Sequence, residues 1–387
     1  MRTLATRIRA LTSRNSEALA GVGIAVESPH YATGVGNGVD VAVLVAEAAV
    51  RLNLGTPIGI AQYPSRRPLA LVEFDAERWL FIKWGDPALE RRSNNERVML
   101  ELIASLEPPE RTARAIPRLI AFDPLDEVLV TEGFPEHISL RTRLNGRVPL
   151  DASYLVEIGA FLSGLHQIPI TDVCAKFSDR HLWFPVARMD DLTPSDFALG
   201  CGVDFRFYVA ALQSVDSELA LLESGWSHRA LIHFDFRDDN ILLPPPERDF
   251  QGPVRVVDWE LAGVGDPLYD VGSLIGQFLY SWLTSVHWSR PEDAVRAFDL
   301  DTPDALLARR NIGLFLTSYF HYCGCSADVV NVMQYAGVFL LQRARARLDM
   351  SGALGRTGHL CLLTGSDLIR SPEKAARLLF KPAGVIE

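Results

Sequence analysis

Between Pro57 and Pro135 the chain consists of short apolar runs that alternate with polar residues and are separated by tight polar turns. The runs IGIAQY, LALVEF and WLFIKW have the period of two that is typical of strands, and PSRRP and DAER join them as a meander. The next segment, NNERVMLELIASL, has apolar residues at helical spacing, with Asn94 or Asn95 as the expected cap. Two further runs, RLIAF and EVLVTEG, complete a predicted α+β lobe of about five strands and one helix over residues 56–135.

After residue 135 the apolar residues change to helical spacing. Helices are predicted for YLVEIGAFLSGLHQI, for DFRFYVAALQSVDSELALLES and for the segment that follows Ser273. One β-like insert interrupts them, with the runs ALIHF, NILLP and VRVVDWE. We therefore predict a small sheet lobe at 56–135 and a mainly helical lobe at 136–387, preceded by an N-terminal extension at 1–55.

Composition argues against several classes of protein. Of the 387 residues, 48% are apolar and 22% are charged, which is ordinary globular usage. No apolar run is long enough to span a membrane, and the Arg-rich N-terminus lacks the apolar block of a secretory signal, so a cytoplasmic location is expected. The net charge of −10 argues against nucleic-acid binding. The five cysteines lack zinc-site spacing and are expected to be reduced and structural.

The stretch LIHFDFRDDNILL, at 231–243, places many polar groups between two apolar runs. A solvated loop would explain it, but His233, Asp235 and Asn240 have the spacing of a kinase catalytic loop. In such loops the aspartate accepts the proton of the acceptor hydroxyl and the asparagine binds a metal ion. VVDWE places Asp258 at the end of the next β-branched run, where kinases have a metal-binding aspartate. Carboxylates and an amide suit Mg²⁺ bridging nucleotide phosphates.

Lys83 lies in the strand WLFIKW between residues that are expected to be buried. The chain has only four lysines against 34 arginines, so a lysine in such a position calls for an explanation. A buried ammonium is costly unless it is paired, and Glu96 in the next predicted helix is the first candidate partner. Glu101 is the second candidate partner. It ranks below Glu96 because the residues that follow Glu101 give a poorer apolar pattern. The alternative is a lysine at a strand edge that reaches water.

Three segments, HFDFRDDNILL, VVDWELAGVGDPLYDVG and FLSGLHQI, together resemble the aminoglycoside phosphotransferase and choline kinase group, the small-molecule branch of the protein-kinase-like fold. The resemblance implies a bilobal fold that uses ATP and Mg²⁺. It also implies that Asp235 is the catalytic base and that Asn240 and Asp258 are the Mg²⁺ ligands. Lys83 would contact the nucleotide phosphates, with Glu96 as its partner.

The resemblance also places the hinge that contacts adenine at Glu132, Gly133 and Phe134. The sequence departs from the group at Phe234, where the group usually has glycine, and this substitution is expected to restrict the backbone beside the base. The turn PSRRP is not glycine-rich, so Ser65 and Arg66, with the following Arg67, either donate to phosphate or are simply solvated.

Other conspicuous residues are interpreted as structural. His166 is expected to be a hydrogen-bonded core histidine, and His233 to brace the catalytic loop. Asp266 and Asp270 are expected to cap and fix the segment after Asp258. The glycine-rich GVGNG at 34–38 lacks the Lys-Ser/Thr ending of a P-loop and is not expected to bind phosphate.

The predicted function is transfer of the γ-phosphoryl group of ATP to a hydroxyl, and the identity of the acceptor stays open. A small-molecule alcohol is the first hypothesis. The second is a seryl or threonyl hydroxyl of a peptide in lanthipeptide-type biosynthesis with a partner lyase. Residues 1–55 would then suit binding of a protein partner. The third is a catalytically silent pseudokinase scaffold.

The charge of the C-terminal segment argues against a polycationic aminoglycoside as acceptor. From Asp301 to the end there are ten basic and seven acidic residues, a difference of +3 in a chain of −10. Three of the bases, Arg343, Arg345 and Arg347, share one predicted helix. A polyamine sugar calls for clustered carboxylates, so a neutral or anionic acceptor, or an acidic peptide, is expected.

Overall fold

The chain folds into two compact units. The computed structural model describes residues 25–27, 40–62, 68–74, 78–85, 92–146, 149–170, 177, 203–245, 252–286, 300–325 and 328–379. The first unit takes the described residues of Met1–Ser105, Ile116–His137 and Val257–Leu261, and the second those of Leu106–Ala115, Ile138–Val256 and Ala262–Glu387. The segment that carries Asp258 thus belongs to the first unit, although residues 136–387 are predicted as one lobe.

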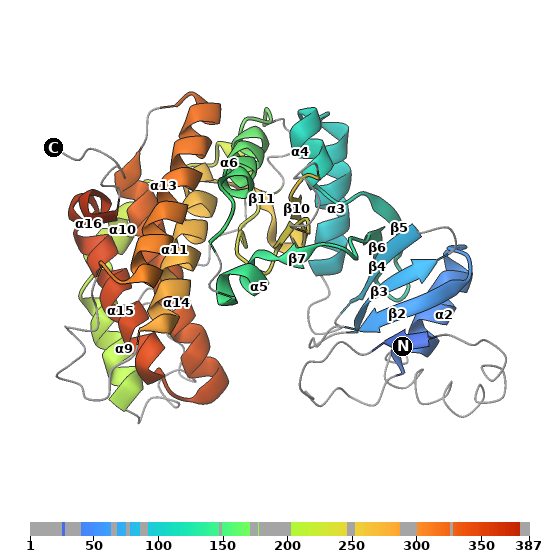
Figure 1. The fold of residues 1–387 in the computed structure, drawn as a ribbon, viewed down its shortest axis with the longest axis horizontal. Helices are drawn as coiled ribbons and strands as arrows, with labels where there is room; N and C mark the ends of the chain where they lie inside the picture. Colours follow the sequence, from blue (N-terminus) through green and yellow to red (C-terminus); the bar gives the residue numbers. More distant parts are fainter. Residues whose placement is uncertain are drawn as a thin grey trace. The chain divides into compact units, whose positions relative to one another are not determined.

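The first unit is built on a six-stranded sheet with the order β1-β2-β3-β4-β6-β5 (Figure 1). Its strands are Ala25–Glu27 (β1), Pro57–Gln62 (β2), Leu69–Phe74 (β3), Arg78–Trp84 (β4), Leu119–Asp123 (β5) and Val128–Glu132 (β6). The neighbouring strands from β2 to β5 pair antiparallel, as the alternating runs predict. Strand β1 adds a parallel pairing with β2 at the edge of the sheet, which the pattern of apolar runs does not predict.

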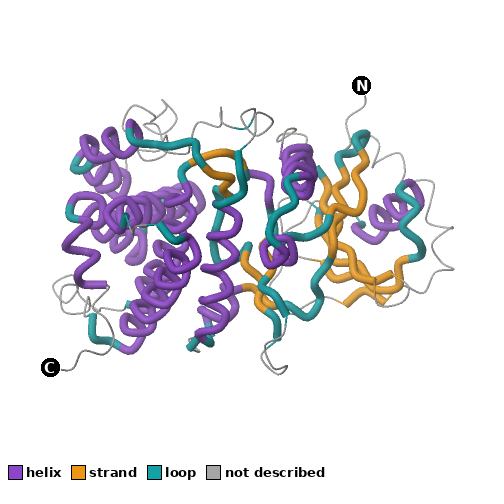
Figure 2. Tube along the Cα trace, turned by 90° about the horizontal axis from the view of Figure 1, so that it is seen from above, coloured by secondary structure: helices purple, strands orange, loops and turns teal. Residues whose placement is uncertain are grey.

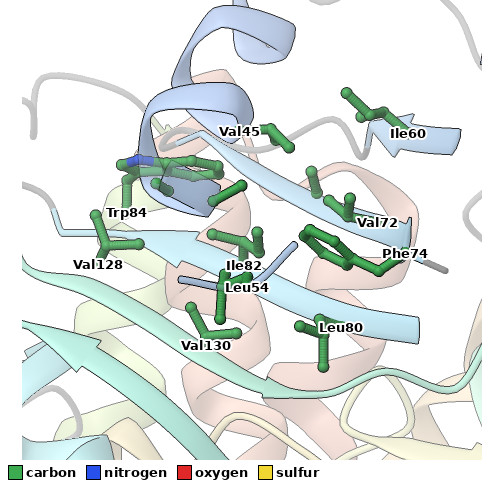
Figure 3. Packing of buried hydrophobic residues seen from close by; sticks show 13 residues of the cluster. Val45, Leu54, Ile60, Val72, Phe74, Leu80, Ile82, Trp84, Val128 and Val130 are labelled. Carbon is green, nitrogen blue, oxygen red and sulfur yellow. The ribbon is translucent and has the colours of Figure 1, made fainter. Parts of the chain in front are cut away.

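Helix α2 (Val41–Arg51) packs on this sheet and shares its core (Figure 3). Asp40 caps the helix, because its side chain accepts a hydrogen bond of 2.9 Å from the backbone N–H of Ala42. Val45 is fully buried among apolar side chains of the sheet, including Val72, and such burial contributes about 1.5–3 kcal/mol per side chain. This helix is therefore part of the packed first unit, whereas residues 1–55 are predicted as an extension.

The second unit is mainly helical, and Figure 2 shows its packed helices in purple. Its helices are Glu110–Ala115 (α4), Leu140–Asn145 (α5), Ala152–His166 (α6), Val203–Gln213 (α9), Asp216–Ser224 (α10), Pro267–Ser285 (α11), Pro303–Cys323 (α13), Val329–Ser351 (α14), Gly355–Arg370 (α15) and Pro372–Leu379 (α16). In the part of the chain that the structure describes, no helix is long and apolar enough to cross a membrane.

The predicted β-like insert forms two small ladders. The first has the order β10-β9-β7 and the second pairs β11 with β8. Their strands are Ile138–Ser139 (β7), Ala230–Ile232 (β8), Ile241–Leu243 (β9), Arg255–Val256 (β10) and Gly263–Gly265 (β11). The loop that carries Asp235 connects the two ladders, because it runs from β8 to β9.

Helices α11 and α14 approach closely where glycines of α11 face α14. A Cβ atom added at Gly276 would lie 2.7 Å from a ring carbon of Phe339, and one at Gly272 would lie 2.9 Å from the backbone nitrogen of Ala336. Neither distance is tolerable for a carbon atom, so the contact requires glycine at both positions. Further along α14, Arg343 and Arg347 contact Gln277 and Tyr280 of α11.

Cys323 and Cys325 form a disulfide, so the expectation of reduced cysteines is wrong for this pair. Cys323 ends α13, and Gly324 turns the chain back with a φ of 64°, the left-handed conformation that ends many helices. The turn brings the two Cα atoms to 5.2 Å, within the range of disulfides, which sequence spacing does not reveal. Cys361 is a free and buried thiol, as expected.

Candidate functional site

The carboxylate of Asp235 is held from two sides within the loop between β8 and β9. The side-chain amide of Asn240 donates hydrogen bonds of 2.9 Å to Oδ2 and to the main-chain oxygen of Asp235. Arg237 Nε donates to the same carboxylate at 3.0 Å. Asp235 is half-buried, so this carboxylate is oriented by its neighbours and still reachable. The spacing read in the sequence thus brings Asp235 and Asn240 into direct contact.

The start of this loop is fixed by Asp270, from the first turns of α11. Asp270 is fully buried and accepts hydrogen bonds from the backbone N–H groups of His233, at 2.6 Å, and of Phe234, at 3.0 Å. His233 in turn accepts a bond of 3.3 Å from the backbone N–H of Asp235 at its Nδ1. The prediction that His233 braces the loop is confirmed. Asp270, however, fixes the loop before Asp235 and not the segment after Asp258.

His166 and Asp266 support the same arrangement. His166 lies between Tyr319 and Asp270, with Nδ1 at 2.9 Å from the tyrosine hydroxyl and Nε2 at 3.5 Å from the carboxylate. Its side chain is only 4% exposed, so the interpretation as a hydrogen-bonded core histidine is confirmed. Asp266 caps α11 by accepting a bond of 3.0 Å from the backbone N–H of Leu268, as expected of a cap.

Phe234 has a φ of 64°, in the left-handed region that favours glycine. This conformation explains why glycine would be favoured at this position. The phenylalanine is held because its ring is buried among aromatic residues, at 6.1 Å from the ring of Trp226 and 5.8 Å from that of Tyr269. Aromatic contacts thus offset the backbone strain at this position.

In the first unit, Lys83 is surrounded by carboxylates. Its Nζ lies 2.7 Å from Glu96 and 3.7 Å from Glu260, and it also donates to Asp258. Lys83, Glu96 and Glu260 are buried, while Asp258 is half-buried. Burial raises the pKa of Glu96, and the carboxylates of Asp258 and Glu260 raise it further against the opposing effect of Lys83. The ion pair that the sequence predicts is present.

Glu101 does not compete for Lys83, because it is exposed and pairs with Arg97 at 2.6 Å. Asn95 does not cap the helix either. The helix α3 (Arg92–Ser105) begins before Asn95. The side-chain amide of Asn95 donates a hydrogen bond of 2.6 Å to the main-chain oxygen of Glu260. Sequence reasoning missed Glu260, although the signal was present in the DWE segment, two residues beyond Asp258.

Each unit, taken by itself, contains oxygen donors that suit a hard cation such as Mg²⁺. Oxygens of Glu96, Asp258 and Glu260 lie within 4.8 Å of one another. When all three are ionised they exceed the single charge of Lys83. Among the described residues no hydrogen bond reaches Oδ1 of Asn240, whose N–H groups are used on Asp235. Carboxylate and amide oxygens are the ligand atoms that Mg²⁺ prefers.

The predicted hinge lies at the end of β6. The backbone N–H of Glu132 donates to the main-chain oxygen of Arg118 and that of Gly133 to Trp79, both at 2.9 Å. The ring of Phe134 lies 5.5 Å from that of His137. The backbone N–H groups of Glu132 and Gly133 therefore already have partners within the protein. Two further predicted nucleotide-binding residues, Ser65 and Arg66, lie outside the described residues.

A cavity of about 200 Å³ lies in the second unit between α5, α11 and α13. Its lining includes the apolar side chains of Phe278 and Trp282 and one carboxylate, that of Asp304. Arginine and lysine do not contribute to this lining in the described part of the chain.

The sequence profile of the phosphotransferase enzyme family matches residues 70–309. Among solved structures, a choline/ethanolamine kinase family protein from Mesorhizobium loti is similar, with a TM-score of 0.54 and 16% identity over 87% of this chain and 98% of that one. A macrolide 2′-phosphotransferase from Brachybacterium faecium gives a TM-score of 0.45 and 14% identity, covering 88% of this chain and 99% of its own.

A glucosamine kinase in complex with glucosamine, ADP and inorganic phosphate gives a TM-score of 0.47 and 16% identity over 80% of this chain and 76% of that one. A comparison with curated protein sequences found no match. The likeness to the Mesorhizobium loti protein shows the fold, and the predicted α+β protein-kinase-like architecture is confirmed.

Proposed function

This chain belongs to the phosphotransferase enzyme family, and from that premise we propose that it transfers the γ-phosphoryl group of ATP, with Mg²⁺, to the hydroxyl of a small molecule. The observation that carries the proposal is the arrangement of Asp235, whose carboxylate is oriented by Asn240 and Arg237 in a loop fixed by Asp270. The family of the chain supports a phosphotransferase in general, and the acceptor and the nucleotide are our proposal.

In this mechanism Asp235 accepts the proton of the acceptor hydroxyl. The acceptor oxygen then forms a bond to the γ-phosphorus, the bond from that phosphorus to the β,γ-bridging oxygen breaks, and ADP leaves. Asn240 and Arg237 keep the carboxylate of Asp235 in one orientation, so that little rearrangement is needed at the moment of transfer. Catalysis comes mainly from positioning and from neutralised charge.

Lys83 is proposed to hold the α- and β-phosphates of the nucleotide, and Glu96 to hold Lys83 in place. Glu132 and Phe134 are proposed for adenine, and Ser65 and Arg66 for phosphate. These four assignments stand on the resemblance alone.

Asn240 and Asp258 are the residues that would hold Mg²⁺. The amide oxygen of Asn240 and the carboxylate oxygens of Asp258 and its neighbours are ligand atoms that Mg²⁺ prefers, which supports this choice. When bound, the ion supplies positive charge to the phosphate oxygens. Glu260 is a further oxygen donor beside Asp258.

The charge balance of residues 301–387 supports an acceptor that is not a polycationic aminoglycoside. This segment has ten basic and seven acidic residues, whereas a polyamine sugar calls for clustered carboxylates. No observation on the described residues favours the peptide acceptor over a small molecule. The intact contacts of Asp235 argue against the pseudokinase hypothesis.

The test is incubation of the purified protein with ATP and Mg²⁺ against pooled alcohols, with kanamycin as a separate sample. ADP release and a mass increase by one phosphoryl group are measured for each pool. We expect transfer to at least one alcohol and none to kanamycin. Phosphorylated kanamycin, or resistance in cells that express the protein, would overturn the exclusion of aminoglycosides.

A further inference from the structure

The three arginines on α14 have different surroundings. Arg345 forms an ion pair with Asp349, with Nε at 2.8 Å from the carboxylate. Arg347 donates to the main-chain oxygen of Leu354 at 3.1 Å and to the hydroxyl of Tyr280 at 3.3 Å. Both of these side chains are thus satisfied within the protein. The third arginine, Arg343, is different.

Arg343 is half-buried and has no carboxylate within ion-pairing distance among the described residues. Its guanidinium carbon lies 4.7 Å from the ring centre of Phe339 and 5.7 Å from that of Tyr280. Its hydrogen bond runs from Nη2 to the neutral side-chain oxygen of Gln277, at a long 3.4 Å. A guanidinium has five N–H donors, so most of its capacity is left over. Two aromatic rings hold the group in place, yet no carboxylate of the described residues forms an ion pair with it.

The electrostatic surroundings of Arg343 are those of the catalytic loop. Burial lowers the pKa of Arg343 and the charge of Arg237 lowers it further, whereas the carboxylates of Asp238 and Asp235 raise it. The guanidinium charge of Arg343 is costly to bury without a counter-ion. A bound oxyanion would supply that counter-ion.

Gln277 connects Arg343 to the loop of the proposed base. The same amide that accepts from Arg343 donates a bond of 2.8 Å to Asp238, three residues beyond Asp235. Asp238 is buried and also bonded by Arg141, so it is already neutralised. Two hydrogen bonds therefore link Arg343 through Gln277 to Asp238, in the same loop as the residue that would deprotonate the acceptor.

We propose that Arg343 is the anchor for a negatively charged group of the acceptor, and that the acceptor is a small alcohol that carries a carboxylate or a phosphate. This inference rests on the proposed function and specifies its substrate class. The planar fork of a guanidinium suits the two oxygens of a carboxylate or phosphate. Phe339 and Tyr280 reduce the entropy lost on binding, because they already restrict the side chain.

The experiment compares acceptor pools matched in size and separated into carboxylated, phosphorylated, uncharged and cationic alcohols. We expect turnover to be concentrated in one of the two anionic pools. Arg343→Gln should raise the KM of that acceptor about ten- to hundredfold, as expected for a lost charge-assisted hydrogen bond, with the KM of ATP unchanged. Arg345→Gln, the same charge change on the same helix, should leave both constants unchanged. Arg343→Lys, which keeps the charge, should fall between Arg343→Gln and the wild type.

A chemical cycle separates recognition from structural damage. A neutral form of the acceptor, for example the amide of a carboxylated alcohol, should lower kcat/KM of the wild type by the same factor as Arg343→Gln does with the charged acceptor. The neutral acceptor should cause little further loss of kcat/KM in Arg343→Gln. Equal losses with charged and neutral acceptors would show that Arg343 is only structural. A cationic preferred acceptor whose turnover depends on Asp304, in the cavity between α5, α11 and α13, would also overturn the inference and leave the proposed function standing.

A binding measurement covers the case in which no pool is turned over. The protein is loaded with ADP and treated with phenylglyoxal, and modification of Arg343 and Arg345 is followed by peptide mass spectrometry. The anionic pools should slow modification of Arg343 and not of Arg345, and the uncharged pool should slow neither. Absence of protection by both anionic pools would overturn the inference. Failure of the protein to bind or cleave ATP would instead contradict the proposed function.

Discussion

The carboxylate of Asp270 accepts a hydrogen bond of 2.6 Å from the backbone N–H of His233, two residues before the proposed base. Its other oxygen accepts from Phe234, so both acceptor atoms are used on the loop. The carboxylate is fully buried and stands in the first turn of α11, whose start is capped by Asp266. One helix thus determines the backbone position of the catalytic loop.

Asp270→Asn should therefore damage both stability and turnover. An amide offers one oxygen and one NH₂ group, so one of the two loop N–H groups would face another donor and stay unpaired. We expect a loss of about 1–3 kcal/mol in the free energy of unfolding and a lower kcat. Urea denaturation and the ADP-release assay measure the two effects. Asp349→Asn, at a carboxylate whose side chain is 48% exposed, is the control and should change stability by less than about 0.5 kcal/mol. Equal effects of the two variants would contradict this role.

Asp235→Asn should abolish transfer while ATP still binds. The asparagine keeps the shape of the side chain but cannot accept the acceptor proton, so kcat should fall by about 10²–10⁴. The lost group acts on the acceptor, and the Kd of ATP should stay within about twofold of the wild type. Calorimetric titration with ATP and the turnover assay separate the two quantities. Turnover at the wild-type rate would mean that the catalytic loop is wrongly assigned.

Lys83→Ala should weaken the use of ATP, and Glu96→Ala should do so more mildly, because Glu96 only positions the lysine. Removal of Lys83 also leaves buried carboxylates without their cation, at a cost of about 3–5 kcal/mol in stability. The KM of ATP is therefore measured at a temperature where circular dichroism shows a folded protein. Glu101→Ala, at an exposed residue paired with Arg97, is the control. A larger effect of Glu101→Ala than of Glu96→Ala would contradict the pairing.

The sequence predicts the parts of the site that depend on short spacing. Asp235 and Asn240 are five residues apart in one loop, so their contact follows from the motif itself. Lys83 and Glu96 are separated by one loop, and the scarcity of lysine marks the first of them.

Contacts made by segments far apart in the sequence could not be predicted. Asp270 reaches back 37 residues to His233, and Gln277 reaches 39 residues to Asp238, so only the tertiary packing shows their roles. The same holds for α2, which lies within the predicted N-terminal extension and whose packing on the sheet only the tertiary structure shows.

Cys361 should be unreactive in the native protein. Burial raises the pKa of this thiol to about 12, although Arg347 and Arg343 act in the opposite direction. Burial disfavours the charged thiolate, so at pH 8 the reactive form is a very small fraction, and the thiol stays protonated up to strongly alkaline pH. Iodoacetamide at pH 8 followed by peptide mass spectrometry should find Cys361 unmodified in the native protein and modified in urea. Rapid modification of the native protein would contradict the burial of this residue.

Replacements of Phe234 should reveal the strain in the catalytic loop. Phe234→Ala removes the ring that packs with Trp226 and Tyr269, and loss of a buried phenylalanine costs about 3–5 kcal/mol. Phe234→Gly loses the same contacts but relieves the left-handed conformation, whose cost is about 1–2 kcal/mol for a residue with a Cβ atom. Glycine also has greater conformational freedom in the unfolded chain, which lowers the stability of the glycine variant by about 0.5–1 kcal/mol relative to alanine.

The glycine variant should therefore be more stable than the alanine variant by about 0.5–1 kcal/mol, a reversal of the usual order. Ala220, within α10, provides the matched control, because Ala220→Gly should lower stability by about 1 kcal/mol at an ordinary helical position. Urea denaturation of the four proteins, including the wild type, measures the differences. An alanine variant at 234 that is as stable as the glycine variant would show that the loop is not strained there, and the aromatic contacts of Phe234 would then have no backbone cost to offset.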